Sequence, residues 1–153
     1  PERGSVAMIR IVLAAAVGLV LGTVPAVCAD IDGTQPLSGV TGKIIEINAY
    51  RINDNVDADT VGLPKKFLVD FASRTLRPTK DSVIRKTIRF DSVAHIENMI
   101  ILQGVDEGVD GVDDGLAWSL AISKKNGKSV LSASGGGVAY VVFGVCTPMS
   151  RAP

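Results

Sequence analysis

Cysteine and histidine are scarce in this sequence, whose 153 residues include two cysteines and a single histidine. Structural zinc sites and disulfide frameworks need several such residues at characteristic spacings, and none of those spacings is present. The histidine, His95, has no nucleophile or carboxylate motif beside it, so it does not indicate a catalytic site. The sequence therefore predicts neither a zinc protein nor a disulfide-stabilised one.

The chain also lacks an excess of charge of one sign, and it contains few aromatic residues. The 16 Lys and Arg residues balance 16 Asp and Glu residues, and aromatic residues make up only 5% of the chain. Binding to nucleic acid regardless of its sequence needs a cationic surface, often with aromatic residues on which bases stack. No phosphate loop and no pair of catalytic carboxylates stands out either. We therefore expect no nucleic-acid partner and no enzyme activity.

The front of the chain carries an uncharged stretch, residues 11–28, that directly follows the positive Arg10. A positive residue, an apolar region and a small-residue end are the three parts of a secretory signal peptide. We predict that residues 1–29 are upstream residues and a signal helix, cut after Ala29. Residues 30–153 would then be a single periplasmic or secreted domain with a net charge of −1, since Arg3, Arg10 and Glu2 leave with the leader.

Loss of the leader removes Cys28 and leaves Cys146 alone in an oxidising compartment. A free cysteine is commonly a small buried hydrophobe, which is the interpretation we prefer, and a disulfide between two chains is the alternative. Retention of the leader as a membrane helix is disfavoured by Pro25 and by the small residues at its end. We expect no stable membrane anchor, and the oligomeric state, monomer or dimer, stays open.

Apolar residues alternate with small ones over residues 115–123. A period of two with one small or polar face is typical of a half-buried strand. Asn126-Gly127 then predicts a hairpin whose return strand is residues 129–134. Glycines 135–137 permit a further reversal into a buried final strand, residues 138–146. The apolar face of the strand at residues 115–123 consists of Leu116, Trp118, Leu120 and Ile122. We expect Trp118 to belong to the core.

The first half of the domain repeats this pattern less cleanly, and no segment of it shows a sustained helical stripe of apolar residues. We expect residues 30–39 and 147–153 to be loose ends. Short strands at turn spacing predict an all-β domain, a small antiparallel meander that forms an open or closed up-and-down barrel of about seven or eight strands. A sandwich is the alternative. The strands expected here are residues 40–52, broken at Gly42, then 67–71, 75–77, 84–96 and 99–103.

One loop is rich in acidic residues separated by glycines, and its acidic members are Asp106, Glu107, Asp110, Asp113 and Asp114. Calcium prefers six to eight oxygen ligands from a flexible loop, so these carboxylates are a candidate calcium site. The spacing differs from that of an EF-hand, and a solvated loop between two strands is the simpler interpretation. A basic segment could pair with this loop, and it contains Arg74, Arg77, Lys80, Arg85, Lys86 and Arg89.

Four blocks of the domain resemble, in order, a small secreted family of uncharacterised proteobacterial proteins. The blocks are residues 67–70 (Phe-Leu-Val-Asp), 101–108, 116–122 and 142–148. This resemblance covers nearly the whole domain and implies a periplasmic location and a β fold, but no function.

A second resemblance, to the periplasmic C-type lysozyme inhibitors, rests on residues 132–135 (Ser-Ala-Ser-Gly) with Tyr140 and Phe143. In that family a serine on this loop and a later lysine enter the lysozyme active site. Ser134 is the matching serine, whereas no lysine follows Lys128. The resemblance makes Ser132, Ser134, Gly135 and Tyr140 candidate binding residues.

These observations predict a non-catalytic periplasmic binding or interaction module. Its first form is a protein-binding module, such as an inhibitor of lysozyme, with a flat or protruding surface around residues 132–140 and no interior pocket. The second is a carrier of a small lipid or metabolite, with an apolar cavity inside the barrel. The third is an envelope protein stabilised by calcium through the acidic loop.

Overall fold

The computed structural model describes residues 30–83, 85–108 and 115–149, and these residues form strands, turns and loops without a helix. The all-β prediction is therefore confirmed for this part of the chain, and the predicted signal helix lies outside it. The strands are β1 (Leu37–Asn48), β2 (Ile52–Asn53), β3 (Lys66–Asp70), β4 (Thr75–Pro78), β5 (Ile88–Arg89), β6 (Ser92–Ile96), β7 (Met99–Asp106), β8 (Leu116–Ser123), β9 (Lys128–Gly135) and β10 (Val138–Pro148).

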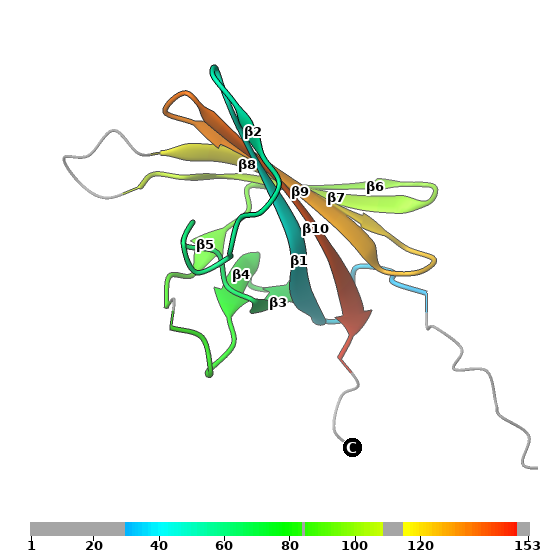
Figure 1. The fold of residues 1–153 in the computed structure, drawn as a ribbon. Coiled ribbons are helices and arrows are strands. Elements are labelled where there is room, and N and C mark those ends of the chain that lie inside the picture. The colour runs from blue at the N-terminus through cyan, green and yellow to red at the C-terminus, as the bar shows by residue number, and fades with distance from the viewer. Residues whose placement is uncertain (1–29, 84, 109–114, 150–153) are drawn as a thin grey trace, which may run out of the picture.

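All strands belong to one antiparallel sheet in the order β5-β4-β3-β1-β10-β9-β8-β7-β6, with the short β2 paired to β1. The sheet curls into a half-barrel, in which β1 and β10 lie between the β3–β5 side and the fan of β6–β9 (Figure 1). Most neighbours in this order are also neighbours in sequence, as the predicted meander requires. The exceptions are two pairings of β1. It pairs with β3, past the short β2, and with β10, which joins the first long strand to the last over Leu37↔Pro148 to Asn48↔Val138.

The two ends of the sheet, β5 and β6, are consecutive in sequence and meet at Phe90 and Asp91. The amide of Phe90 donates to the carbonyl of Arg74 on the β4 side at 3.1 Å. The next amide, of Asp91, donates to the carbonyl of Gln103 on β7 at 2.8 Å. The chain therefore crosses from one end of the curled sheet to the other, and its backbone groups are paired on both sides of the crossing.

The strand alternation expected around Trp118 is confirmed, because Trp118, Leu120 and Ile122 are buried and their neighbours on β8 are more exposed. The predicted hairpin joins β8 to β9, and Gly127 has the positive φ of 68° that such a turn demands. A Cβ on Gly127 would also collide with the carbonyl oxygen of Cys146. Glycine is thus required there by both conformation and space.

The break predicted at Gly42 is a β-bulge. Between Thr41 and Ile44 the register of β1 against β10 shifts by one residue, so that two residues oppose Phe143. A bulge bends its strand and increases the local twist, which helps a sheet to curl.

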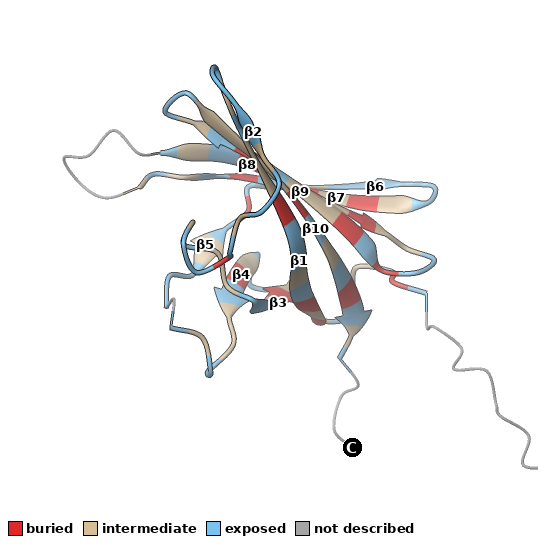
Figure 2. Ribbon diagram, in the orientation of Figure 1, coloured by how far each residue is buried: buried red, intermediate tan, exposed pale blue. Residues whose placement is uncertain are grey.

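Buried residues recur along the strands of the sheet (Figure 2), and their apolar side chains form two clusters. The larger cluster lies around Leu102 and Leu120, which are 0% and 1% exposed. The smaller contains Ile44, Ala58 and Val142, and Leu131 packs against both.

The prediction that residues 30–39 are loose is wrong. Ile31 and Leu37 are 3% and 1% exposed, and the amide of Ile31 donates to the carbonyl of Lys124 at 3.0 Å. Apolar burial and backbone pairing both hold this segment, so β1 begins three residues before the predicted start at Val40.

The outward side chains of five neighbouring strands, β7, β8, β9, β10 and β1, form three rows across the sheet, and the third row ends on β1 at the bulge residues Gly42 and Lys43. We call these rows the outer face. Row by row they are Val105, Ala117, Ser134, Ala139 and Ile47, then Gln103, Ser119, Ser132, Val141 and Ile45, then Ile101, Ala121, Val130 and Phe143.

Over the residues that the structure describes, no helix is long and apolar enough to span a bilayer.

Replacing Gly104 on β7 with alanine should destabilise the fold. A Cβ there would lie 2.7 Å from the carbonyl oxygen of Arg89, where the chain crosses, and 2.8 Å from Cζ2 of Trp118. Overpacking of this kind costs about 1–3 kcal/mol, and Gly104→Val should cost more than Gly104→Ala. Urea unfolding would measure this loss. The control is Ala94→Val on the exposed side of β6, which should stay within about 0.5 kcal/mol of wild type. Equal stability of Gly104→Val and wild type would contradict the tight crossing.

Candidate functional site

An apolar cavity of about 120 Å³ lies inside the curl of the sheet. Leu76 and Leu120 from the larger core cluster and Val142 from the smaller one line it, together with Leu131, which contacts both. The cavity therefore occupies the place where the two clusters meet. Its remaining lining residues are Val40, Thr41, Gly62, Leu63, Pro64, Phe67, Arg77, Pro78, Lys86, Ile88, Asp106, Ser129 and Gly144.

Glycine on the inward face of β10 helps to keep this space open. Gly144 pairs with Thr41 at the start of the bulge and lines the cavity. A Cβ on it would lie 2.5 Å from the carbonyl oxygen of Val40 and 3.2 Å from Oγ of Ser129. Small barrels are normally filled by their inward side chains, so an inward position without one leaves room in that layer.

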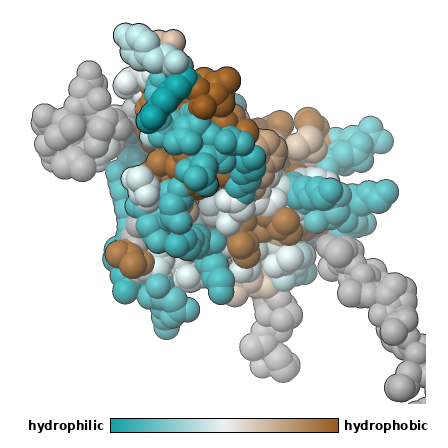
Figure 3. All heavy atoms as spheres, viewed as in Figure 1, coloured by the Kyte–Doolittle hydropathy of each residue, from teal (hydrophilic) through white to brown (hydrophobic). Residues whose placement is uncertain are grey.

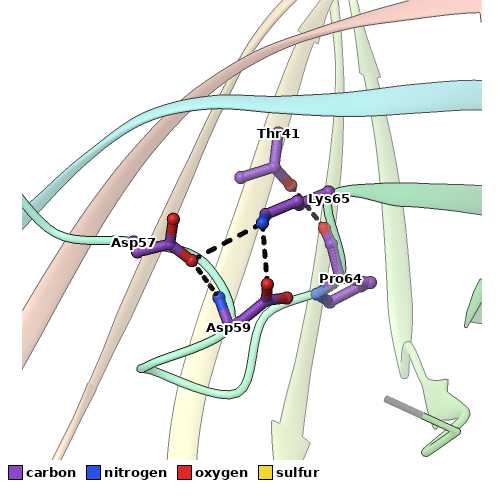
Figure 4. Close-up of polar contacts among 5 residues, drawn as sticks. All are labelled: Thr41, Asp57, Asp59, Pro64 and Lys65. Carbon is purple, nitrogen blue, oxygen red and sulfur yellow. Dashed lines mark hydrogen bonds and ion pairs between the residues drawn. The ribbon is translucent and has the colours of Figure 1, made fainter. Parts of the chain in front are cut away.

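Gly62, Leu63 and Pro64 line one side of the cavity. They belong to the segment of residues 57–65, which we call the mouth loop and whose polar contacts are drawn in Figure 4. Lys65 Nζ lies 2.7 Å from Oδ2 of Asp59 and 3.7 Å from Oδ1 of Asp57. The hydrogen bond from Lys65 to Asp59 and the charge of Asp57 raise the pKa of Lys65. Because these side chains are exposed, the ion pairs themselves contribute little to stability.

Backbone contacts and burial hold the mouth loop more firmly. The hydroxyl of Thr41 donates to the carbonyl of Pro64 at 2.7 Å, and the amide of Leu63 donates to the carbonyl of Ala58 at 2.9 Å. Ala58 is itself buried in the smaller core cluster against Ile44. The mouth loop is thus part of the packed structure rather than a free lid.

An ion pair between Lys86 and Asp106 lies at another edge of the cavity. Asp106 also accepts a hydrogen bond from the amide of Gly108 at 3.0 Å, and Lys86 donates to the carbonyl of Gly108 at 3.3 Å. Partial burial raises the pKa of Asp106, but the hydrogen bonds from Lys86 and Gly108 outweigh it, so the pKa is lowered overall. For these two residues, the predicted pairing of the basic segment with the acidic loop is confirmed.

The structure describes only two of the five residues of the candidate calcium site. Asp106 faces Lys86 and Glu107 is exposed, while Asp110, Asp113 and Asp114 lie outside the described residues. Among the residues that the structure does describe, no three carboxylate, histidine or cysteine groups gather in a way that could hold a metal ion. Calcium binding by the loop stays a prediction.

The candidate binding residues of the β9–β10 hairpin are divided between the two faces of the sheet. Ser132 and Ser134 point outward and are exposed, whereas Tyr140 points inward and packs against the smaller core cluster. Burial, and then the charge of its cross-strand neighbour Glu46, raise the pKa of Tyr140. Gly135 has no room for a side chain, because a Cβ would collide with the carbonyl oxygen of Gly115. The structure therefore brings Ser132 and Ser134 together but not with Tyr140.

The preferred interpretations of Cys146 and Trp118 agree with the structure. Cys146 is 1% exposed, and burial raises the pKa of its thiol to about 11 although the hydroxyl of Ser129 opposes this. Trp118 is 6% exposed, and its indole N–H has no hydrogen-bond partner among the residues that the structure describes. Both side chains belong to the larger core cluster.

Sequence reasoning did not identify Ser129 or the mouth loop as lining a cavity, and it named Arg77 and Lys86 only as members of the basic segment. These residues are distant in sequence, and only the curl of the sheet brings them together. The available signal was the inward glycine in the alternation of the last strand, at Gly144.

Comparison with known proteins gave no match to a family model, to a curated protein or to a solved structure. The resemblances to a small secreted proteobacterial family and to the C-type lysozyme inhibitors therefore stay predictions.

Cys146 should react with a thiol reagent only when the protein unfolds. The nucleophile is the thiolate, which is scarce at pH 8 when the pKa is about 11, and the side chain is buried as well. In a Cys28→Ser background, labelling in buffer should be at least about a hundredfold slower than in guanidinium chloride. Equally fast labelling in both solutions would show that Cys146 is accessible in the native state.

The Lys86–Asp106 pair should give a small contribution to stability that depends on acid pH. Because the folded pKa of Asp106 is below its ordinary value of 3.8, the contribution is present above that value and is lost as the pH falls through the folded pKa. Its size should be about 0.5 kcal/mol, since the Lys86 side chain is half exposed and solvent screens the pair. An NMR titration of the Asp106 carboxyl carbon should give a midpoint below 3.8 that rises in Lys86→Met. A midpoint unchanged by Lys86→Met would contradict this account.

Proposed function

We propose that the protein is a non-catalytic binding protein that receives the apolar end of a small ligand in its cavity. The observation that carries the proposal is an aliphatic cavity inside the curled sheet, lined by Leu76, Leu120, Leu131 and Val142. A largely apolar concave site with a few polar groups at its edge is the usual form of a small-molecule site. Of the three functions that the sequence suggests, the small-ligand carrier is the one that such a cavity favours.

The volume limits what can enter. Pockets that enclose a drug-sized ligand measure roughly 300–1,000 Å³, and an engineered apolar cavity of roughly 150 Å³ binds benzene. A cavity of about 120 Å³ accommodates a short alkyl chain or a group smaller than one ring. The ligand we propose therefore inserts one apolar end and leaves the rest of the molecule at the edge.

The charges at that edge suit a polar or anionic head group. Among the described lining residues the cations are Arg77 and Lys86, and the acidic residue is Asp106, which pairs with Lys86. The acidic residues of the mouth loop, Asp57 and Asp59, are both within ion-pair distance of Lys65, so Arg77 is the cation left to meet a head group. An acyl or alkyl chain with a carboxylate or similar end matches both parts of the site. Such molecules occur in the bacterial envelope, where the predicted leader would send the protein.

The protein-binding alternative, with lysozyme inhibition as its most specific form, draws its support from the exposed Ser132 and Ser134. In that proposal Tyr140 would not take part, since it packs on the opposite face of the sheet. No described residue yet favours the calcium-stabilised alternative.

Filling the cavity should abolish binding of short-chain probes. NMR titrations with hexanoate and with hexanol should shift the amide signals of Leu120, Leu131 and Val142, and Val142→Phe should remove these shifts because its ring occupies the space. Hexanoate should bind more tightly than hexanol if the cations at the edge contribute. The matched control is Val141→Phe, the outward neighbour on the same strand, which should bind as wild type does.

A milder variant, Val142→Leu, guards against misfolding caused by the larger ring. The added methylene should cost less than about 1.5 kcal/mol of stability and should weaken binding without abolishing it. Absence of shifts with both probes in the folded wild-type protein, or equal binding by Val142→Phe and Val141→Phe, would refute the proposal.

A further inference from the structure

Positive charge is concentrated in the segment of residues 65–91, which contains strands β3, β4 and β5. This segment has eight Lys and Arg residues against three Asp residues, a net charge of +5, whereas the predicted mature domain as a whole has a net charge of −1. Two of the cations, Lys65 and Lys86, are neutralised by carboxylates outside the segment. The others are exposed and form no ion pair with a carboxylate that the structure describes, and they are Lys66, Arg74, Arg77, Lys80, Arg85 and Arg89.

The described residues between β4 and β5, 79–83 and 85–87, form a loop that projects from the sheet at the lower left of Figure 1, and we call it the basic loop. Both of its ends lie at the cavity, because Pro78 directly precedes it, Lys86 belongs to it, and both residues line the cavity. The molecular surface over β3, β4 and β5 is mainly hydrophilic in the same view (Figure 3). A surface that binds the basic loop would therefore lie beside the cavity edge.

An exposed valine lies among the cations of the basic loop. Val83 is 89% exposed, and in sequence it stands between Lys80 and Arg85. The guanidinium of Arg85 donates to the carbonyl of Lys80 at 2.9 Å, so the two cations are held together on either side of the valine. Single apolar residues on a surface are common and mean nothing alone. An apolar residue flanked by Lys and Arg, however, is the composition of segments that lie in the interface of an anionic bilayer.

The net charge around the basic loop is sufficient for such a surface. The opposing acids are Asp81 on the loop and Asp70, which interacts with Arg77. Four cations against two acids leave a net charge of +2. Each Lys or Arg near an anionic bilayer contributes about fivefold to binding, so this charge gives a preference of about twentyfold over a neutral bilayer. The four cations on the basic loop or beside its start are Lys66, Arg77, Lys80 and Arg85.

The chemistry of the segment favours lipid over other polyanions. A nucleic acid is bound through exposed aromatic side chains on which its bases stack. All three phenylalanines of residues 65–91 are buried or half-buried, and the segment has no other aromatic residue. A soluble polyanion also offers no apolar layer for Val83, whereas the interface of a bilayer does.

From these observations we infer that the basic loop is a docking site for an anionic lipid bilayer, in which Val83 enters the interface and the neighbouring cations meet the lipid head groups. The docking depends on the basic loop alone. Its use in loading the cavity rests on the proposed function, because molecules with an acyl chain and an anionic end reside in bilayers, and docking would hold the cavity edge against one.

The test is cosedimentation with sucrose-filled vesicles of phosphatidylglycerol or of phosphatidylcholine, without added ligand. The protein is recovered from the periplasm of producing bacteria, and all variants carry the same N-terminus, so the leader affects them equally. Wild type should bind phosphatidylglycerol about twentyfold more tightly than phosphatidylcholine, and salt at about 0.5 M should remove this difference. Lys80→Glu combined with Arg85→Glu should weaken binding to phosphatidylglycerol by a factor of about one hundred or more.

The matched control is Lys125→Glu combined with Lys128→Glu. It makes the same charge change at exposed positions of the β8–β9 hairpin, which lies on the other side of the molecule in Figure 1, and it should bind within about twofold of wild type because salt screens remote charges. Equal binding by the two charge-reversed proteins, or equal binding of wild type to both lipids, would overturn the inference.

Variants of the valine separate insertion from attraction between charges. Val83→Ser should weaken binding to phosphatidylglycerol by about fivefold, and Val83→Leu should tighten it by up to about fourfold through one added methylene. Equal binding by these two variants would overturn the inference. So would wild-type binding to heparin without binding to phosphatidylglycerol, which would assign the basic loop to a soluble polyanion.

Failure of this inference can be distinguished from failure of the proposed function. Neither Lys80 nor Arg85 lines the cavity, so the variant with both reversed should give the hexanoate shifts of wild type. Wild type that docks on vesicles without hexanoate shifts would uphold the docking site and refute the ligand. Hexanoate shifts without docking would refute the docking site and leave the ligand in place.

Discussion

The pairing of β1 with β10 is the constraint on which both the cavity and the outer face depend. It joins the two longest strands, which lie far apart in sequence. Through it the β3–β5 side of the sheet is hydrogen-bonded to the β7–β9 side. Ile44 and Val142, which face each other across this pair, form the smaller core cluster. The outward members of the same pair, such as Ile45 and Val141, form one edge of the outer face. Loss of this pairing would therefore open the cavity and divide the outer face at the same time.

The strands from β7 to β1 present apolar side chains on both faces, and each face has its own consequence. Inward, two clusters fill most of the space and leave a small cavity where Leu131 touches both. Outward, rows of small and apolar side chains remain uncovered in the single chain, with Lys43 at the bulge. The mouth loop, held by Thr41 and by the burial of Ala58, lies on the cavity side.

Periodicity was enough to predict much of the fold from the sequence. The alternation around Trp118, the hairpin at Gly127 and the bulge at Gly42 are local features, and each is present in the structure. The start of β1 was predicted too late because Ile31 and Leu37 are isolated apolar residues, whose burial follows from long-range contacts rather than from a pattern.

The site was harder to predict than the fold. The candidate binding residues were chosen as neighbours in sequence, but alternation along a strand sends Ser134 and Tyr140 to opposite faces. The cavity edge combines Arg77, Lys86 and Asp106 from separate strands and loops, and no spacing in one sequence reveals that they meet. The opposite charges of the basic segment and the acidic loop predicted that the two segments pair. They did not predict that Lys86 and Asp106 are the residues that do so.

The place of β10 in the sheet also determines when the domain can form. A chain that is synthesised, or passes through a pore, with its N-terminus first presents β1 early and its main partner last. The intervening hairpins can form locally, but β1 must wait for the final strand, and such non-local pairing slows folding. Until β10 is available, β1 can pair only with β2 and β3, and its long edge toward β10 stays unpaired. The order of the strands thus leaves the pairing of β1 with β10, and the closed sheet that depends on it, to form last.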